Sequence, residues 1–489
     1  MSRLRPGLGL GFAGLVGVSM MALAPQSAVA TSPVGATSSV GATSSVGVDF
    51  PAAATTAVST LPADHGGLAV CGGAFAAFGC QAEIATAGPE STALPHSSTP
   101  MGWGANDLRA AYGLPARSPH SGTVALIDVG PYPTLSGDLA TYRAQYGLPA
   151  CTVTTGCLRQ IDYQGGPALP PPVTAADKAT AQQLAIETAV DVDMASVTCP
   201  ACRLLEVQVP LGLAPKDPLR ASDYEGYATA FDTAVHTAIA AGADAISLSF
   251  TMPGDENMLH GPIAQALDQP GVAITAAAGD LGFNGDGDSL TLTNPAFTGG
   301  AAVWPQALPT VTSVGGTTLN EQGHRYAQSA WGQSGSGCAP GVNPPEGQPA
   351  SVSRLCAGAR ASTDVSAIAA NIAMYDSYRP ADNAAAGWQV IAGTSTSSPQ
   401  IAGMYAAGGN LGDVLGPTTL YRAPASAFSD ITSGANVIPP YSGSNGCSAT
   451  ASGPSQSQPV TQFDDRLCQA RPGWDGPTGL GVPHGFTAF

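Results

Sequence analysis

The chain has 489 residues, a formal net charge of −17 and only 10% charged residues. The acidic balance argues against nucleic acid or an anionic membrane surface as a partner. The length allows one large α/β domain with accessory segments, or about two to three ordinary domains. Few charges also mean few ion pairs for acid to break, so tolerance of low pH is expected.

The first 30 residues have the pattern of a secretory signal peptide. Arg3 and Arg5 give a positive start, an apolar run extends from Leu8 to Ala24, and Ala28-Val29-Ala30 offers a small-residue cleavage site. A membrane anchor is the alternative, but Gly and Ser dilute the apolar run. We therefore predict a secreted, extracellular protein with signal peptide 1–30, and no membrane partner once it is removed.

Residues 31–100 are predicted to be a low-complexity linker and short N-terminal segment that is open to removal. The hexapeptide GATSSV occurs at 35–40 and again at 41–46. Apolar runs separated by turn residues, the pattern of a globular domain, begin near Met101, which predicts one domain over 101–489.

Within that domain, apolar β-branched runs alternate with helix-like stretches. The strand candidates are TVALIDV (123–129), RLLEVQV (203–209), DAISLSF (244–250) and VAITAAA (272–278). A helix with Tyr227, Phe231, Val235 and Ile239 every four residues separates the second and third. This alternation predicts an α/β fold with a doubly wound, mostly parallel sheet and helices on both faces.

Ten cysteines fall into sequence-local pairs, as expected for disulfides in an exported chain. Cys199-Pro-Ala-Cys202 is also compatible with a redox or zinc site, although a small structural loop is favoured. The simplest connectivity joins neighbours: Cys71 with Cys80, Cys151 with Cys157, Cys199 with Cys202, Cys338 with Cys356, and Cys447 with Cys468.

The stretch GTSTSSPQIAG, residues 393–403, contains a candidate nucleophile, Ser395. A serine hydroxyl at a helix start is favoured as a nucleophile because the helix N–H groups and dipole stabilise developing negative charge. The alternative is that the hydroxyl residues only cap the helix.

A serine nucleophile needs a base, and no histidine has a suitable setting. All seven are interpreted as surface or structural residues: His65, His96, His120, His236, His260, His324 and His484. Carboxylates are the substitute, because Glu187 and Asp191 are spaced i, i+4 on one face of a predicted helix. The pair is surrounded by apolar residues, although a solvated acidic face is the alternative.

Asp280 follows the strand VAITAAA at a Gly-Asp corner, where functional side chains project in parallel-sheet folds. A protonated aspartic acid donates a hydrogen bond to an oxyanion, whereas an ionised one repels it. An ordinary turn aspartate is the alternative.

Together these stretches resemble the sedolisin family of secreted serine-carboxyl peptidases, in its bacterial branch. Glu187 to Asp191 resembles the family's ExxxD helix, Ala278-Gly279-Asp280 its oxyanion motif, and Gly393-Thr394-Ser395 its nucleophile motif. The resemblance implies a subtilisin-like fold, with Ser395 as nucleophile, Glu187 as base, Asp191 supporting it and Asp280 at the oxyanion. Asp128 resembles the subtilisin aspartate and is expected to extend the acidic network.

The resemblance also implies one structural calcium ion near the C-terminus. The motifs FSDITSGAN (428–436) and RPGWDGPTGLG (471–481) resemble the two halves of the family's calcium site. Two capping aspartates in turns are the alternative. The implied ligands are the carboxylates of Asp430 and Asp475 and the carbonyls of Ile431, Arg471 and Gly473.

Three departures from the family are visible. The family's long N-terminal pro-domain is not evident before residue 101. Leu281 follows Asp280 where the family often has Ser, and Phe250-Thr251 stands where an aromatic-Gly pair is usual. The sequence therefore predicts a secreted, acid-acting serine endopeptidase that cleaves polypeptides as a monomer. A non-catalytic secreted binding or structural protein with the same fold is the alternative.

Overall fold

The computed structural model describes residues 67–70, 79–86, 93–94, 96–214, 221–285, 300–322, 325–382, 386–437, 447–449 and 461–489. All of them belong to one compact unit, Asp49–Phe489. The predicted signal peptide and most of the predicted linker lie outside the described residues. The proposed domain boundary at residue 101 stays a prediction.

The core of the unit is an eight-stranded sheet with the order β11-β10-β8-β6-β3-β5-β4, in which β14 also pairs with β10. Every pairing is parallel except that of β10 with β11. The strands are β3 (Thr123–Val129), β4 (Leu158–Asp162), β5 (Arg203–Val209), β6 (Ala245–Leu248), β8 (Ala273–Ala277), β10 (Thr312–Gln322), β11 (Arg325–Ala330) and β14 (Val365–Ile368). The predicted mostly parallel sheet is confirmed.

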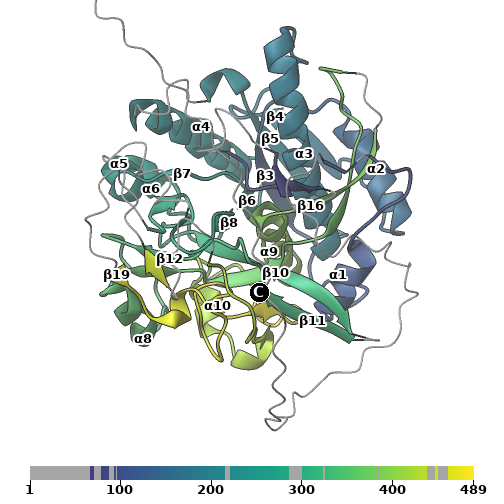
Figure 1. Cartoon of the computed structure of the whole chain (residues 1–489). Helices are drawn as coiled ribbons and strands as arrows, with labels where there is room; N and C mark the ends of the chain where they lie inside the picture. The colour runs from purple at the N-terminus through teal and green to yellow at the C-terminus, as the bar shows by residue number, and fades with distance from the viewer. Residues whose placement is uncertain are drawn as a thin grey trace, which may run out of the picture. The chain divides into compact units, whose positions relative to one another are not determined.

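Helices cover both faces of this sheet (Figure 1). On one side α3 (Ala175–Thr198) and α9 (Thr394–Gly408) pack against each other and on the strands, with α2 (Leu135–Gln145) and α1 (Ala105–Ala111) outside α3. On the other side lie α4 (Ala221–Ala240), α5 (Glu256–His260) and α6 (Pro262–Ala266). All seven residues of β3 are buried, as a strand covered on both faces requires.

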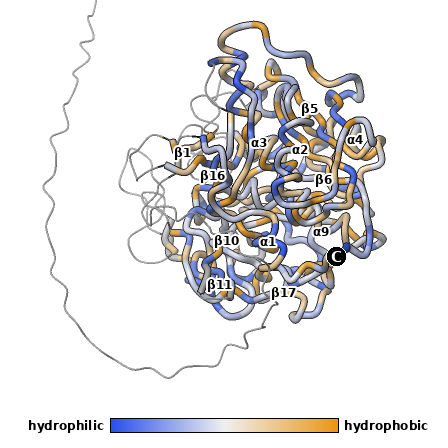
Figure 2. Tube along the Cα trace, turned by 90° about the vertical axis from the view of Figure 1, so that its right-hand side faces the viewer, coloured by the Kyte–Doolittle hydropathy of each residue, from blue (hydrophilic) through white to orange (hydrophobic). Residues whose placement is uncertain are grey.

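The apolar stripe predicted for the helix after β5 is the buried face of α4. Tyr227, Phe231 and Val235 are fully buried, and the chain leaves the helix at Gly242 with a φ of 88°. Figure 2 shows apolar residues recurring along α4, β5 and β6. None of the helices in the described part of the chain combines the length and apolarity that crossing a bilayer demands.

A second sheet of four strands has the order β1-β2-β16-β15. Its strands are β1 (Gly67–Ala69), β2 (Glu83–Ala85), β15 (Ile372–Asp376) and β16 (Gly387–Ala392), and all its pairings are antiparallel. Figure 2 shows β1 and β16 on the same side of the molecule, and β2 lies between them in the sheet. Part of the segment before residue 101 therefore pairs with the strand that leads into α9.

The remaining short elements lie mainly in loops and in the C-terminal part. They are β7 (Met252–Pro253), β9 (Val303–Trp304), β12 (Gly337–Ala339), β13 (Arg360–Ser362), β17 (Phe428–Ser429), β18 (Ser448–Ala449), β19 (Thr461–Gln462), β20 (Val482–Pro483), α8 (Ala350–Ser353) and α10 (Thr418–Arg422).

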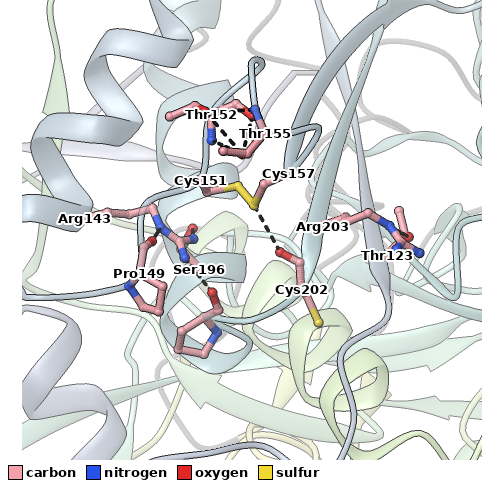
Figure 3. Close-up of a disulfide and its surroundings, with 11 residues drawn as sticks. Thr123, Arg143, Pro149, Cys151, Thr152, Thr155, Cys157, Ser196, Cys202 and Arg203 are labelled. Atoms are coloured by element: carbon pink, nitrogen blue, oxygen red, sulfur yellow. Dashed lines mark hydrogen bonds between the residues drawn. A yellow bond between two sulfur atoms is a disulfide. The ribbon is translucent and has the colours of Figure 1, made fainter.

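Four of the five predicted disulfides are present, namely Cys151–Cys157, Cys199–Cys202, Cys338–Cys356 and Cys447–Cys468. Cys80 is disulfide-bonded as well, but its predicted partner, Cys71, lies outside the described residues. Figure 3 shows the first bridge, where Cys157 Sγ lies 3.6 Å from the Cys202 carbonyl oxygen. The bridges Cys151–Cys157 and Cys199–Cys202 directly precede β4 and β5, so they lie at the ends of these strands opposite to the carboxyl ends.

Candidate active site

Candidate functional side chains gather at the carboxyl ends of three neighbouring parallel strands. Asp128 lies near the end of β3, Ser249 directly follows β6, and Asp280 follows β8. The order β8-β6-β3 makes these strands adjacent. Parallel strands end at the same edge of a sheet, so the three residues are brought together there.

Ser395 lies in the first turn of α9, whose N-cap is Gly393. The Ser395 side chain is fully buried, and its Oγ lies 3.4 Å from the carbonyl oxygen of Ser249. Gly393 has a φ of 135°, and a Cβ there would lie 2.1 Å from Gln81 O and 2.8 Å from Asp280 Oδ2. Only glycine therefore permits this close approach, which explains the Gly before Thr394-Ser395.

Glu187 reaches Ser395 because α3, which carries it, packs directly against α9. Burial raises the pKa of Glu187 well above its usual value, the Ser395 hydroxyl opposes this rise as a hydrogen-bond partner, and the nearby Asp128 and Asp280 carboxyls raise it further. Neither Glu187 oxygen, however, meets a donor at normal hydrogen-bond length. We interpret this as a loose contact, of the kind that tightens when the hydroxyl reacts.

Asp191 lies one turn further along α3 and is also fully buried. Its Oδ1 accepts a hydrogen bond of 2.8 Å from the Ser249 hydroxyl. Burial and the Glu187 carboxyl raise the pKa of Asp191 well above its usual value, whereas the Ser249 bond lowers it. Two buried carboxyls at this spacing favour sharing protons over carrying two charges.

Two further buried acids, Asp128 and Glu206, adjoin the carboxyl pair of Glu187 and Asp191. Burial, Asp191 and Glu206 all raise the pKa of Asp128, which is fully buried. Burial raises the pKa of Glu206 to about 7, although Gln208 and Gln160 donate hydrogen bonds of 3.0 and 2.7 Å to its carboxyl oxygens. The sequence singled out Asp128, but Glu206 carries no sequence signal beyond an acid inside an apolar strand.

Asp280 is joined to the nucleophile motif. Its Oδ1 accepts hydrogen bonds of 2.8 Å from both the backbone N–H and the hydroxyl of Thr394. The Thr394 hydroxyl in turn accepts from Gly279 N at 3.1 Å. The structure thus holds Asp280 beside the first turn of α9, with Oδ2 on the side of Gly393.

The described histidines lie away from Ser395. His236 and His260 are exposed, and His96 contacts Arg379 and Gln389. His65 and His324 lie outside the described residues. Among the described residues, the ionisable groups around Ser395 are thus carboxyls, and Ser395, Glu187, Asp191 and Asp280 lie in one region of the structure.

The two halves of the implied calcium site also lie together. Asp430 Oδ2 accepts from Gly473 N at 2.9 Å, and Asp475 Oδ2 accepts from Arg471 N at 2.8 Å. Burial raises the pKa of Asp475 to about 7, its hydrogen bonds lower it, and the Asp430 carboxyl raises it. Two carboxyls in adjoining turns supply oxygen ligands of the kind that a hard cation prefers.

No group of three or more His, Cys, Asp or Glu residues capable of holding a metal occurs in the part of the chain that the structure describes. A calcium ion at Asp430 and Asp475 would therefore depend on main-chain carbonyls and water for its other ligands. The carbonyls of Ile431, Arg471 and Gly473 are in the adjoining turns. The donor set fits a hard cation of this kind.

Besides Glu206, sequence reasoning missed two contributors to the site. Ser249 anchors Asp191, and the only signal was its position at the end of a buried strand. Gln81, whose carbonyl oxygen accepts from Ser395 N at 3.0 Å, gave no signal, because the contact joins residues that are far apart in sequence.

Comparisons with known proteins find one sequence family and several solved structures that are similar to this chain. The model of the subtilase family matches residues 205–413. No curated protein matches the chain in sequence. Among solved structures, Pseudomonas sedolisin, a serine-carboxyl proteinase complexed with two molecules of pseudo-iodotyrostatin, matches with a TM-score of 0.56 and 21% identity, over 79% of this chain and 96% of that one.

Other similar structures are more distant. Fervidolysin from Fervidobacterium pennivorans, a keratinolytic enzyme related to subtilisin, has a TM-score of 0.39 and 12% identity over 75% of this chain and 42% of that one. Sphericase has a TM-score of 0.42 and 17% identity over 80% of this chain and 99% of that one. The chain thus has a subtilisin-like fold, and the segment 205–413 is similar to the subtilase family.

Proposed function

We propose, from a subtilisin-like fold whose residues 205–413 match a family of serine peptidases, that this chain is an exported serine-carboxyl endopeptidase that works in acid. One observation carries the proposal. The Ser395 hydroxyl lies beside the buried Glu187 carboxyl, which is itself next to the buried Asp191 carboxyl, and a serine peptidase needs its base at this place. The substrates are polypeptides.

In the proposed reaction, Ser395 Oγ attacks the carbonyl carbon of the scissile peptide bond while Glu187 accepts the hydroxyl proton. Asp191 shares a proton with Glu187 and is held by Ser249, so the pair passes through the step without two buried charges. Glu187 then gives the proton to the leaving amine. Water releases the acyl group by the same route in reverse.

The oxyanion is stabilised by the Ser395 N–H at the start of α9 and by Asp280. The helix dipole favours negative charge at this end. Asp280 contributes a hydrogen bond only as the protonated acid, because an ionised carboxylate repels the developing charge. Thr394 fixes Asp280 through two hydrogen bonds.

Activity in acid follows from these proton requirements. The active form carries one proton shared by Glu187 and Asp191 and another on Asp280. Loss of these protons at higher pH removes the oxyanion donor and places two charges in a buried site. Activity is therefore expected to fall towards neutral pH.

Two further assignments belong to the proposal. Signal 1–30 directs export, after which the protein acts extracellularly as a monomer, and the disulfides suit an oxidising compartment. One structural calcium ion binds through Asp430, Asp475 and nearby carbonyls. The ion supplies charge neutralisation that holds the two C-terminal turns together and takes no part in peptide cleavage.

A non-catalytic binding protein is the second candidate. It is favoured by one observation: Ser395, Glu187 and Asp191 are fully buried in this structure. A protein that never opened this site would cleave nothing.

Digestion of a denatured protein at about pH 4 separates the two. Wild type is compared with Ser395→Ala and with Ser397→Ala, a matched control two residues further along α9 whose hydroxyl donates to the Ala367 carbonyl. The proposal expects digestion by wild type and Ser397→Ala and a loss of at least about 10⁴-fold in Ser395→Ala. Equal digestion by wild type and Ser395→Ala would refute it.

A further inference from the structure

A short segment of the chain itself, residues 79–86, runs through the candidate active site. On one side it pairs with the residues that follow β6: Gln81 N donates to Ser249 O at 3.1 Å, and Thr251 N donates to Gly79 O at 3.3 Å. The Gln81 side chain adds a 2.7 Å hydrogen bond from Nε2 to Thr251 Oγ1. The main chain of residues 79–81 thus lies as an added antiparallel strand on this edge.

On its other side, the same segment pairs with the strand that leads into the nucleophile. Glu83 is opposite Ala392 and Ile84 is opposite Ile391 in an antiparallel register. Gln333 Nε2 holds the Glu83 carboxyl at 2.6 Å. Addition of an extended peptide to strand edges is a common mode of peptide recognition, and here both flanks of one peptide bond are held in this way.

The bond between these flanks is Gln81–Ala82, and its carbonyl occupies the oxyanion position. Gln81 O accepts from the backbone N–H of Ser395 at 3.0 Å. The amide of a nucleophilic serine is one of the donors that stabilise a tetrahedral oxyanion. A Cβ on Gly393 would contact both Gln81 O and Asp280 Oδ2, so these two oxygens lie on the same side of Gly393.

The segment also closes the site. Ser395 and Glu187 are fully buried, and Gln81 and Ala82 are only 8% and 2% exposed. An external polypeptide needs the edges after β6 and beside β16, and residues 79–86 already occupy both. No added substrate reaches Ser395 until this segment leaves.

We propose that residues 79–86 form an intramolecular substrate strand, which keeps the active site closed until Ser395 cleaves the Gln81–Ala82 bond. The inference rests on the proposed peptidase function and adds to it a regulatory segment and a defined processing site.

The cleavage balances as an ordinary hydrolysis. Ser395 Oγ bonds to the Gln81 carbonyl carbon, the bond to Ala82 N breaks, and the hydroxyl proton passes through Glu187 to the new Ala82 amine. Water then gives its oxygen and one hydrogen to the Gln81 carboxyl and its other hydrogen to Ser395 Oγ. The products are a fragment that ends at Gln81 and a chain that begins at Ala82.

The test follows the N-terminus of the full-length protein during incubation at about pH 4, by intact mass and N-terminal sequencing. The variants are Ser395→Ala, Gln81→Pro and Gln81→Ala. Proline removes the N–H that donates to Ser249 O, whereas alanine keeps it and serves as the matched control. We expect a new N-terminus at Ala82 in wild type and Gln81→Ala, and a loss of this cut of at least about tenfold in the other two.

A second experiment uses synthetic peptides, so its result does not depend on whether the protein variants fold. Processed enzyme is given a synthetic peptide of residues 79–86, with Cys80 replaced by Ser, and the same peptide with Pro at the Gln81 position. The first is expected to be cut between Gln and Ala and to compete with a denatured protein substrate. Equal behaviour of both peptides would overturn the inference.

Different results would refute the substrate-strand inference and the proposed peptidase function. If added protein is digested in a Ser395-dependent manner but the active chain keeps residues 79–86 uncut, the inference is overturned and the peptidase assignment stands. If Ser395→Ala digests added protein as well as wild type, the proposed function itself is refuted.

Discussion

Helix α3 carries buried carboxyls on two different faces, and the two groups are held in opposite ways. Glu187 and Asp191 face α9 and the candidate nucleophile, whereas Asp193 faces α2 and β15. All three are at most 2% exposed. The difference lies in what surrounds each charge.

On the active-site face, the surrounding ionisable groups are acids. The charged neighbours that shift the pKa of Glu187, Asp191 and Asp128 are other carboxyls, and each raises it. The opposing contributions come from the hydroxyls of Ser395 and Ser249 alone. Such carboxyls are stable inside the protein mainly as neutral acids.

On the other face, Asp193, Asp138 and Asp376 are accompanied by cations. Arg379 forms an ion pair with Asp376, and the buried Arg143 lowers the pKa of Asp193. Burial nevertheless raises the pKa of both Asp193 and Asp376.

Hydrogen-bond donors complete this second group. Tyr132 OH donates to Asp138 Oδ2 at 2.8 Å and lies 3.2 Å from Asp376 Oδ1, and Tyr378 N donates to Asp376 at 2.8 Å. A buried acid with cations and several donors is a structural group, whereas one with neither is a candidate for proton transfer. The comparison therefore assigns different roles to carboxyls of one helix.

The largest expected effect comes from neutralising one acid on each face. Glu187→Gln is expected to lower kcat/KM for a denatured protein by about 10³-fold or more, because glutamine cannot accept the Ser395 proton. Asp193→Asn, on the other face, is expected to change kcat/KM less than about threefold. Peptide-release assays at about pH 4 measure both, and equal losses in the two variants would erase the distinction.

A second prediction removes a cation from the structural face. Arg379→Met leaves the buried Asp376 without its partner and is expected to lower the free energy of unfolding by about 3–5 kcal/mol at neutral pH, and by less in acid. Arg422→Met breaks the exposed pair with Glu346 and is the control, with an expected change below about 1 kcal/mol. Denaturant unfolding at two pH values measures these costs, and a small effect of Arg379→Met would contradict the structural role.

The third prediction concerns stability against pH. Burial raises the pKa of Glu206 to about 7 and of Asp232 to about 8, so the folded protein keeps protons that the unfolded chain releases near about pH 4. The stability that these groups contribute is therefore present in acid and is lost as pH rises to about 8, by at most about 1.4 kcal/mol per pH unit for each proton.

Thermal unfolding between about pH 4 and 8 checks this sign. Asp232→Asn removes one such proton and is expected to flatten the decline. A melting temperature that rises steadily over this range in wild type would show that these carboxyls are ionised in the folded state.

The smallest effect is expected from calcium. Chelation is expected to lower Tm by a few degrees, about 2–5 °C, because the ion binds only the folded C-terminal turns. Asp475→Asn is expected to remove the response, and Asp465→Asn, an exposed aspartate nearby, to keep it. A Tm that ignores chelator in wild type would argue against calcium at Asp430 and Asp475.

Local patterns in the sequence predicted most of what positions the site. Apolar runs predicted β3, β5, β6 and β8, and the i, i+4 spacing placed Glu187 and Asp191 on one helical face. The strand-end position of Asp280 and the helix start at Ser395 followed from local chemistry as well. These features depend on residues that are neighbours in the chain, which is why a single sequence shows them.

Features that depend on distant pairing were not predictable. The hydrogen bond from Ser395 N to Gln81 joins two segments more than 300 residues apart, and composition alone made residues 31–100 a linker. Nothing in an Ala- and Gly-rich stretch distinguishes a strand that fills an active site from a tether. Arg143 near Asp193 comes from α2, and Arg379 paired with Asp376 follows β15, and no local pattern relates either arginine to α3.

The central claim is that carboxyls serve as the base and the oxyanion donor for Ser395. The pH dependence of kcat/KM on a short peptide substrate, measured on processed enzyme that stays folded throughout, tests it most directly. We expect a bell-shaped dependence of kcat/KM on pH, with its maximum in acid and with kcat/KM lost on the basic side before neutral pH. We also expect loss of activity in Glu187→Gln. A rate that keeps rising to about pH 8, or that survives Glu187→Gln, would contradict it.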